Sequence, residues 1–406
     1  MIDWKKTTSV IPDGVQTLSK MPNKHVEGVY PPYIEKGLGP FVWSEGKRYI
    51  DYPCGLGAIL LGYAHPRVNE AVRKVLTTGT IFSLPHKMET ELAEKIVELI
   101  PSAEMVRFLK TGSEATSAAV RIARAYTGKR DIICCGYHGW HDWYNCTTDK
   151  NKGCDTYDAC SRLEFNNIAF FEKRMNLSIA AVIIEPYVYE LPKDNFLQKL
   201  KDLCHKNNAL LIFDEVVTGF RTKGYSAQKY FGVTPDLTCL GKAMGNGVPI
   251  SCVCGKKEIM EELEGDCFVS STFGGDLIGI AAALETIKIV QKEEVIERIW
   301  HNGQRFIDGF NKLHSFVKCI GLPPRTFFEF PTLEHKSLFW QECLKRGVLF
   351  GYAQFISYAH TPNEIDFTID VMKHAMDIVK RYWDNPQEVL EGPVAKEAFH
   401  VKTSSS

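Results

Sequence analysis

The 406-residue chain lacks the features that would assign it to a membrane, a secretory route or nucleic acid. No apolar run reaches the roughly 18 residues that a membrane-spanning helix needs, and the polar opening MIDWKKTTSVIPDG has no signal-peptide pattern. The 48 basic and 49 acidic side chains nearly cancel, and a formal net charge of −1 gives no reason to expect nucleic acid or anionic lipid. The sequence therefore predicts a cytoplasmic globular protein with no nucleic-acid or membrane partner.

Cysteine is plentiful, with 13 residues, but no C-x-x-C motif of the kind found in metal and redox sites occurs. The cysteines at 134–135 and 252–254 stand in apolar, strand-like runs, which favours reduced core residues over disulfides. His138 and His141 follow the first of these pairs and raise the idea of a metal site. No further ligand cluster completes such a site, so the sequence predicts no metal.

Internal repeats and low-complexity segments are also absent, and the middle of the chain alternates short apolar runs with helical patterns. The runs are rich in Ile, Val, Leu and Cys and show little alternation with polar residues, as is typical of strands buried on both faces of a parallel sheet. They read MVRFL, DIICCGY, AAVIIEPY, ALLIFDEVV, DLTCLGK and SCVCGK. This pattern predicts an α/β fold with a mostly parallel central sheet flanked by helices.

Other patterns predict a hairpin and several helices. FVWSEGKRYIDY is typical of a β-hairpin with its turn at Glu45-Gly46, and helical patterns cover residues 66–76 and 87–100. A long helix is expected from DLIGIAAALETIKIV to about Leu313, with or without a break.

We expect four segments along the chain. Residues 1–65 form an N-terminal segment that joins a small domain, and residues 66–310 form the large α/β domain. Residues 311–385 form the C-terminal, small α+β domain, and residues 386–406 form a polar, flexible tail.

LTCLGKAMGNGVPI, residues 237–250, places one lysine, Lys242, among small and apolar residues. Burial disfavours the charged form of an amine, and a lysine that loses its proton easily can act as a nucleophile. The alternative is a strand-end lysine whose stem is covered while its charged head reaches water. This stretch alone leaves both interpretations open.

Polar residues follow the other predicted strands, and in an α/β sheet such ends share one edge. TGSEAT, residues 111–116, combines a glycine, a hydroxyl and the free N–H groups of a helix start, which suits a phosphate but also an ordinary N-cap. Asp214 ends the apolar run ALLIF, and a buried carboxylate needs a cationic or hydrogen-bonding partner or it will hold a proton. A protonated pyridine nitrogen would serve as that partner, and so would an arginine such as Arg221. Tyr137 ends DIICCGY, where its ring could stack on a flat cofactor or belong to the core.

A phosphate cradle, an aromatic face, a buried aspartate and a shielded lysine together match the phosphate, ring, ring nitrogen and aldehyde of pyridoxal phosphate (PLP). LLIFDEVVTGFR, TPDLTCLGKAMGNGVP, STFGGD and YAQFISYAHT resemble the class III aminotransferases of fold type I, above all their glutamate-1-semialdehyde aminomutase branch. The resemblance extends over nearly the whole chain, and its two main motifs place Asp214 and Lys242 28 residues apart. It implies the fold type I architecture, with a seven-stranded central sheet and a smaller α+β domain built from both ends of the chain.

Carried over position by position, the resemblance implies roles for the residues around the cofactor ring. Lys242 forms the internal aldimine with PLP and shuttles the proton during the reaction. Asp214 pairs with the pyridine nitrogen. Val216 lies against one face of the ring and Tyr137 covers the other.

The resemblance also implies how the rest of the cofactor is held. Gly112 and Ser113 bind the phosphate, and Glu185 lies near the phenolic oxygen and the substrate. Thr272 reaches the phosphate bound by the other subunit, so the protein is expected to be a homodimer with shared active sites.

The implied activity is PLP-dependent transamination, in which an amino donor and a keto or aldehyde acceptor react in turn by a ping-pong mechanism. The alternative is a 2,1-aminomutase, in which one substrate skeleton both gives and receives the amino group. Aminomutases carry an N-terminal segment resembling Pro-Gly-Gly-Val-Asn-Ser-Pro-Val-Arg, whose arginine grips the substrate carboxylate. This chain instead has LSKMPNKHVEGVYPP and no arginine before Arg48, which favours transamination of a different substrate.

Two further features bear on the function. The variants SKMP…GVYPP and STFGGD resemble a subgroup from surface-carbohydrate and secondary-metabolite synthesis, which points to a keto-carbohydrate acceptor. A third interpretation is a non-catalytic homologue that serves as a binding protein, and the presence of both Asp214 and Lys242 argues against it.

Overall fold

The computed structural model describes residues 4–154 and 159–396, which form two compact units. The large unit contains residues 57–60 and 66–297, and the small unit contains the remaining described residues. Within the described ranges, no helix is both long and apolar enough to cross a membrane.

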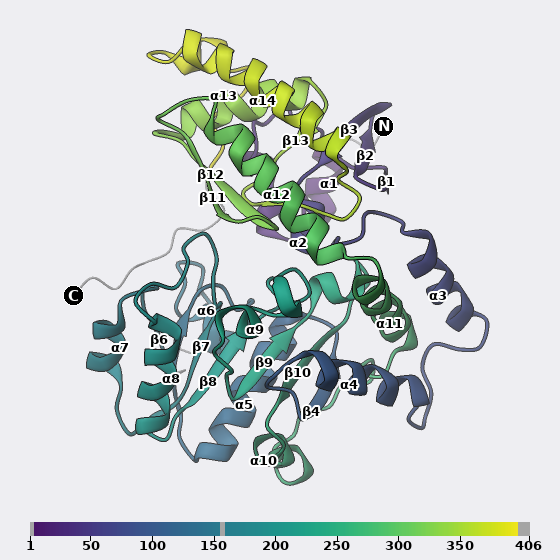
Figure 1. Ribbon diagram of the computed structural model, residues 1–406, viewed down its shortest axis with the longest axis vertical. Helices are drawn as coiled ribbons and strands as arrows, with labels where there is room; N and C mark the ends of the chain where they lie inside the picture. The colour runs from purple at the N-terminus through teal and green to yellow at the C-terminus, as the bar shows by residue number, and fades with distance from the viewer. Residues whose placement is uncertain (1–3, 155–158, 397–406) are drawn as a thin grey trace. The chain divides into compact units, whose positions relative to one another are not determined.

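The large unit is built on one seven-stranded sheet with the strand order β4-β10-β9-β8-β7-β5-β6 (Figure 1). β10 runs antiparallel to both of its neighbours, and the other neighbouring pairs are parallel. The predicted mostly parallel sheet is therefore confirmed, and each apolar run named above contains one strand; the short edge strand β6 has no such run. The strands are β4 (Met105–Leu109), β5 (Asp131–Cys135), β6 (Cys160–Arg162), β7 (Ile179–Ile184), β8 (Leu210–Asp214), β9 (Leu237–Leu240) and β10 (Ser251–Gly255).

The sheet is buried on both faces, which explains why its strands do not alternate apolar and polar residues. On β5, Ile132 belongs to the apolar core on one face and Ile133 to the core on the other. The small side chains of α5 (Gly112–Thr127) complete the first core. The second core is completed by α8 (Phe196–Lys206), which packs on β8 (Figure 1).

The other helices connect the strands, and α3 and α4 match the helices predicted over 66–76 and 87–100. The predicted long helix is two helices, α11 and α12, because Glu294 between them adopts a left-handed φ of 49°. These elements are α3 (Pro66–Leu76), α4 (Lys87–Leu99), α6 (Asp142–Asn145), α7 (Ile168–Arg174), α9 (Ala227–Phe231), α10 (Lys257–Met260), α11 (Leu277–Lys292) and α12 (Val295–Asn311), with the 3-10 helices η4 (Lys223–Tyr225), η5 (Lys242–Gly245) and η6 (Glu261–Glu264).

The small unit combines a four-stranded sheet, β1-β2-β3-β13, with a three-stranded one, β11-β12-β14. The predicted hairpin is confirmed, since β2 and β3 are joined by Glu45 and Gly46, both of which have positive φ. The strands are β1 (Lys36–Leu38), β2 (Phe41–Ser44), β3 (Lys47–Asp51), β11 (Lys318–Leu322), β12 (Arg325–Glu329), β13 (Val348–Leu349) and β14 (Gln354–Phe355).

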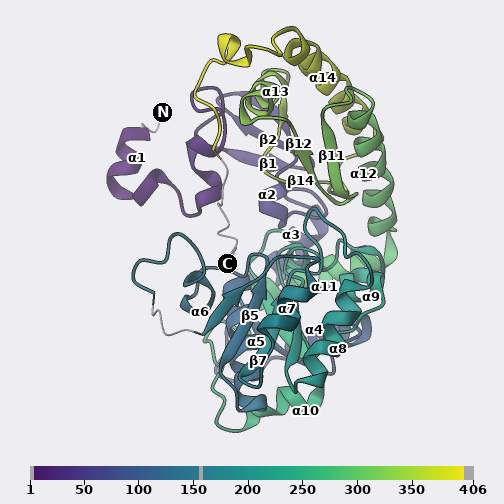
Figure 2. The same cartoon turned by 90° about the vertical axis from the view of Figure 1, so that its left-hand side faces the viewer.

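Helices α12 and α14 lie side by side in the small unit (Figure 2), where a Cβ at Gly309 would come within 2.6 Å of Ile369. Arg305 on α12 also pairs with Asp366 on α14 at 2.5 Å. The remaining helices are α1 (Trp4–Val10), α2 (Cys54–Gly57), α13 (Leu333–Lys345) and α14 (Pro362–Arg381), with the 3-10 helices η1 (Pro12–Gly14), η2 (Leu18–Lys20), η3 (Pro22–Lys24) and η7 (Pro386–Val389).

The sequence predicts a flexible tail over residues 386–406, and the structure describes the first part of this segment. Ala395 is buried, and its N–H donates to Oγ of Ser337 at 3.0 Å. Residues 386–396 are thus held in part by a backbone hydrogen bond, a contact that polar composition does not reveal. The rest of the predicted tail lies outside the described residues.

Candidate active site

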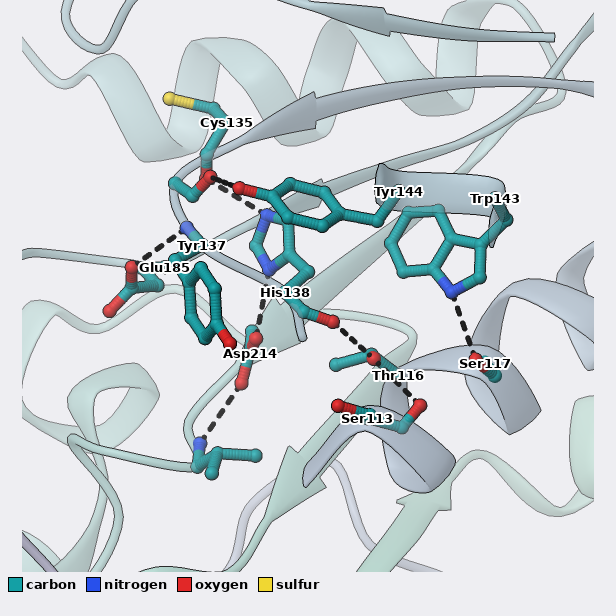
Figure 3. Close-up of polar contacts among 12 residues, drawn as sticks. Ser113, Thr116, Ser117, Cys135, Tyr137, His138, Trp143, Tyr144, Glu185 and Asp214 are labelled. Carbon is teal, nitrogen blue, oxygen red and sulfur yellow. Dashed lines mark hydrogen bonds and ion pairs between the residues drawn. The ribbon is translucent and has the colours of Figure 1, made fainter. Parts of the chain in front are cut away.

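The predicted site residues of the large unit, apart from Thr272, follow the strands of its sheet. Tyr137 comes after β5, Glu185 after β7 and Lys242 after β9, while Asp214 is the last residue of β8. The first turn of α5 comes after β4. Because these strands are parallel to one another, their carboxyl ends meet at one edge of the sheet, as Figure 3 shows for several of these residues.

Asp214 has a partner on each oxygen of its buried carboxylate (Figure 3). Oδ2 lies 2.8 Å from Nδ1 of His138, and Oδ1 accepts the N–H of Val216 at 3.1 Å. Only 4% of Asp214 is exposed, so these contacts replace the water that a carboxylate would otherwise bind. The same contacts orient the carboxylate.

The surroundings of His138 favour its charged, doubly protonated form. Nε2 lies 3.1 Å from the carbonyl oxygen of Cys135, which can only accept, and Nδ1 faces an acidic oxygen. Burial by itself would lower the pKa of His138, but the hydrogen bond and negative charge of Asp214 outweigh burial, and the pKa is raised. Sequence spacing suggests only a metal-ligand role for His138 and does not reveal this contact.

Arg221, the arginine considered as a partner for Asp214, has other acceptors. It is fully buried, and its Nη2 donates to the carbonyl oxygens of Gly57 at 2.8 Å and Ile59 at 2.6 Å. Glu215, next to Asp214, accepts backbone N–H groups at the start of α9. The cationic partner of Asp214 is therefore a histidine, and its neighbour Glu215 has a structural task.

Tyr137 and Glu185 are tied together at the ends of β5 and β7. The N–H of Tyr137 donates to Oε1 of Glu185 at 3.0 Å. Gly136 has a φ of 113° and allows this approach, since a Cβ there would lie 3.1 Å from the Glu185 side chain. Tyr137 is 46% exposed, and the centroid of its ring lies 5.8 Å from that of Tyr144 in an edge-on arrangement. An exposed aromatic residue whose orientation is supported by a neighbouring ring is suited to stacking on a flat ligand.

The first turn of α5 is a capped helix start that also suits an anion. Oγ1 of Thr111 accepts the N–H of Glu114 at 3.3 Å, and Oε2 of Glu114 accepts the N–H of Thr111 at 2.7 Å. Gly112 and Ser113 follow the cap, where helix geometry leaves N–H groups without an intrahelical acceptor. Oγ of Ser113 accepts the N–H of Trp140 at 3.3 Å and keeps its own hydrogen for another acceptor. The N-cap alternative is thus compatible with a phosphate site.

Two glycines allow neighbouring segments to approach the first turn of α5 closely. Gly139 has a φ of 100°, and a Cβ there would lie 2.2 Å from Oγ of Ser113. A Cβ on Gly112 would lie 2.9 Å from Cγ1 of Val216. The residues predicted to hold the phosphate and one ring face are therefore direct neighbours.

Two further side chains of α5 anchor the loop that carries His138 (Figure 3). Oγ1 of Thr116 donates to the carbonyl oxygen of His138 at 2.8 Å. Oγ of Ser117 lies 2.7 Å from Nδ1 of His141 and accepts Nε1–H of Trp143 at 2.9 Å. His141, the second histidine considered for a metal, is thus part of this anchor. The sequence shows these hydroxyls only as small residues on one helix face.

Lys242 is half-buried and begins η5 with a φ of 44°. A left-handed φ is costly for a residue with a Cβ, and strain of this kind concentrates at functional sites. The preceding Gly241 lies close to Val216, because a Cβ on it would be 3.5 Å from Cγ1 of that valine. Lys242 therefore follows a segment that packs against the predicted ring-face residue.

Thr272 differs from the other predicted residues because it is exposed, in the turn that precedes α11. Two large apolar side chains of the same segment are also exposed, Phe268 at 73% and Phe273 at 57%. Large exposed apolar groups mark interaction surfaces when they gather.

The functional groups of these residues match the chemical groups of PLP. The first turn of α5 offers N–H groups and a hydroxyl to a phosphate, and Asp214 offers an oriented carboxylate to a protonated ring nitrogen. Lys242 offers an amine, and Tyr137 an exposed ring. Among the described residues, no group of three or more His, Cys, Asp or Glu side chains could hold a metal ion.

Comparison with known proteins places this site in a family. The family model for aminotransferase class III matches residues 23–322. The glutamate-1-semialdehyde 2,1-aminomutase of Syntrophobacter fumaroxidans is 35% identical, over 91% of this chain and 95% of that protein. The 3-aminobutyryl-CoA aminotransferase of Cloacimonas acidaminovorans is 32% identical, over 93% of this chain and 96% of that protein.

A solved structure agrees with this assignment. The PLP internal aldimine form of the FumI protein from Sphingopyxis sp. MTA144 has a TM-score of 0.88 and 27% identity, over 95% of this chain and 98% of that chain. The predicted family, fold and cofactor are thus confirmed. The chain belongs to the class III aminotransferases of fold type I and is a PLP-dependent enzyme.

Proposed function

We propose that this enzyme is a transaminase that moves an amino group from an amine donor to a separate carbonyl acceptor in two successive half-reactions. The observation that carries the proposal is the occurrence of Asp214 and Lys242 at one sheet edge, with His138 behind the carboxylate. PLP supplies, when bound, an electron sink for the negative charge left on a substrate carbon that loses its proton.

Asp214 holds the proton of the pyridine nitrogen. Its carboxylate is suited to this task because His138 and the N–H of Val216 orient it and stabilise its negative charge. Tyr137 and Val216 would cover the two faces of the ring, and Glu185 would lie near the phenolic oxygen. The hydrogen bond between Tyr137 N–H and Glu185 supports a fixed spacing of these two groups.

Lys242 would hold the cofactor through its amine and would act as the base that takes a proton from the substrate carbon. Both tasks need the neutral amine, because only that form can act as a nucleophile or as a base. The strained φ of 44° supports a position that is maintained for function.

Gly112 and Ser113 bind the phosphate, and in a homodimer the partner's Thr272 completes this site. The exposed Phe268 and Phe273 beside Thr272 support an interface at this turn. The segment 80–84 adds exposed apolar groups, with Leu84 at 78%, and it adjoins the turn because the N–H of Leu277 donates to the carbonyl oxygen of Thr80 at 2.8 Å. A second copy of the chain would cover these side chains.

Transamination is favoured over the aminomutase reaction by the missing carboxylate clamp, since no arginine precedes Arg48. The 3-aminobutyryl-CoA aminotransferase among the relatives supports the same choice. The aminomutase relatives support the alternative of an intramolecular transfer, and the two reactions differ in their products.

A half-reaction screen tests the proposal. PLP-loaded enzyme is mixed with single amines, and we expect one donor class to convert the bound cofactor to pyridoxamine phosphate with release of one carbonyl product per site. Addition of a keto sugar or another carbonyl compound should then restore the original spectrum. An enzyme that only converts glutamate-1-semialdehyde into its isomer, with no released carbonyl, would be an aminomutase. A protein that binds no PLP would be a non-catalytic homologue.

We also propose that the enzyme works in the cytoplasm. All 13 cysteines are free thiols, which supports a reducing compartment. Fractionation of cells that produce the tagged protein should recover it with cytoplasmic markers, and recovery with membranes or culture medium would refute this location.

A further inference from the structure

Lys110 and Asp276 form a largely buried ion pair that none of the roles above uses. Nζ of Lys110 lies 2.7 Å from Oδ2 of Asp276, and each side chain is only 17% exposed. Nζ also donates to the carbonyl oxygen of Pro249 at 3.4 Å. A mostly desolvated pair with an additional acceptor is screened by water far less than a surface pair.

The pair joins three segments that carry cofactor-binding residues. Lys110 directly precedes the first turn of α5, which holds Gly112 and Ser113. Pro249 belongs to the loop that follows Lys242. Asp276 ends the turn that carries Thr272 and accepts N–H groups at the start of α11.

The turn that carries Thr272 packs closely against neighbouring elements beside this ion pair. A Cβ on Gly274 would lie 2.8 Å from the carbonyl oxygen of Phe108 at the end of β4, and a Cβ on Gly275 would lie 3.0 Å from the carboxyl group of Glu89. Glycine is therefore needed at 274 for the turn to lie against β4, whereas a Cβ at 275 would displace the carboxyl group of Glu89 on α4. Thr272 itself is exposed, so a shift of the turn relative to β4 would change the position of Thr272 on the surface.

We propose that the Lys110–Asp276 ion pair links the two cofactor sites of the homodimer. On one side it holds the phosphate-binding turn of its own chain, and on the other it holds the turn that presents Thr272 to the neighbouring phosphate. This inference rests on the proposed homodimer. Both residues are positioning residues, because neither of them touches the cofactor in this arrangement.

A purely structural ion pair gives a different expectation. It would contribute to the stability of the chain that contains it, and a lesion in one subunit would leave PLP binding in the other subunit unchanged. A linking pair instead weakens PLP binding in the neighbouring subunit when it is broken. The decisive measurement is therefore the PLP affinity of an unaltered chain whose neighbour carries the lesion.

Single variants provide the first test, with the PLP dissociation constant and the midpoint of thermal unfolding as readouts. Asp276→Asn keeps a capping oxygen and removes the charge, and Lys110→Met keeps the stem. We expect each to weaken PLP binding about tenfold, and the double variant to be little weaker than either single variant, because both remove one interaction. Lys110→Arg should stay close to wild type.

Lys256→Met is the matched control, because it breaks a 2.8 Å ion pair with Asp236 at the opposite edge of the same sheet. It should lower the unfolding midpoint without changing PLP affinity. Equal PLP affinities for wild type, Asp276→Asn and Lys110→Met would overturn the inference.

Mixed dimers provide the second test. One chain carries Lys242→Ala and Asp276→Asn, the other is wild type, and two affinity tags isolate the mixed species. Only the wild-type chain has the amine that produces the absorption of bound PLP, so its own site is observed. We expect about tenfold weaker PLP binding at that site than in the mixed dimer with Lys242→Ala alone.

Equal affinities in the two mixed dimers would overturn the link while leaving the homodimer intact. A chain that sediments as a monomer and yields no mixed species would refute the homodimer and the link together. The two failures are therefore distinguishable.

Discussion

Nδ1 of His138 lies 2.8 Å from Oδ2 of Asp214, while Nε2 of the same ring lies 3.1 Å from the carbonyl oxygen of Cys135. The ring thus bridges the end of β5 to the end of β8, and the positive charge favoured by these two acceptors lies directly behind the proposed partner of the pyridine nitrogen. His138→Asn should remove this charge and the bridge. We expect turnover to fall roughly tenfold to a hundredfold, the scale of one hydrogen bond to a charged group. Steady-state kinetics on PLP-saturated enzyme would show this loss, and unchanged turnover would contradict the role of His138.

The free energy of unfolding of the PLP-free protein should depend on pH because of the contact between His138 and Asp214. The pKa of His138 is raised above its ordinary value of 6.5, because the hydrogen bond and charge of Asp214 outweigh the lowering effect of burial. The charged contact therefore adds stability below about pH 6.5, and this contribution is lost as the pH rises through the raised, folded-state pKa. Urea unfolding of wild type and His138→Asn should show a difference in free energy that shrinks with rising pH. A difference independent of pH would mean that His138 stays neutral.

Lys242→Ala should abolish turnover and the visible absorption of bound PLP while the protein remains folded. The lysine is half-buried and begins a short 3-10 helix, so its loss should change the free energy of unfolding by no more than about 1 kcal/mol. Absorption spectra, circular dichroism and borohydride reduction followed by peptide mapping check these points. Labelling of another lysine in the wild-type enzyme would contradict the assignment of Lys242.

Gly139→Ala should be far more harmful than an alanine at another left-handed glycine. A Cβ at 139 would lie 2.2 Å from Oγ of Ser113, whereas a Cβ on Gly128, with a φ of 67°, would meet no atom within 4 Å. Gly128→Ala therefore isolates the conformational cost, about 1 kcal/mol. Gly139→Ala adds the clash and should cost roughly 2–5 kcal/mol and weaken PLP binding. Similar unfolding free energies and PLP affinities for the two variants would show that the 139 loop can move away from Ser113 without consequence.

Mixing two inactive variants tests the shared active site. In the proposed homodimer, Lys242→Ala and Thr272→Asp should each disable every site. If Thr272 acts across the interface as proposed, one site of a mixed dimer collects both lesions and the other has none. Activity approaching half of wild type per mixed dimer is expected. No recovery, despite subunit exchange shown by tagged chains, would mean that each chain builds its site alone.

The sequence by itself determined the α/β class, the strands and the residues at their ends. Unbroken apolar runs such as ALLIF can only be buried on both faces, and parallel strands bring their carboxyl ends to one edge. These two local rules are enough to bring Asp214 and Lys242 to the same edge of the sheet, because Asp214 ends β8 and Lys242 lies two residues after β9. The resemblance to class III aminotransferases then supplied the cofactor.

Only the tertiary structure decided which residues support that site. His138 and Asp214 are 76 residues apart, and Lys110 and Asp276 are 166 apart, so no local periodicity relates them. The sequence suggested Arg221 as a possible partner of Asp214. In the structure, Arg221 instead donates hydrogen bonds to the carbonyl oxygens of Gly57 and Ile59. Long-range contacts between polar groups depend on where loops from separate strands meet, and that follows from packing of the whole unit rather than from any one stretch of chain.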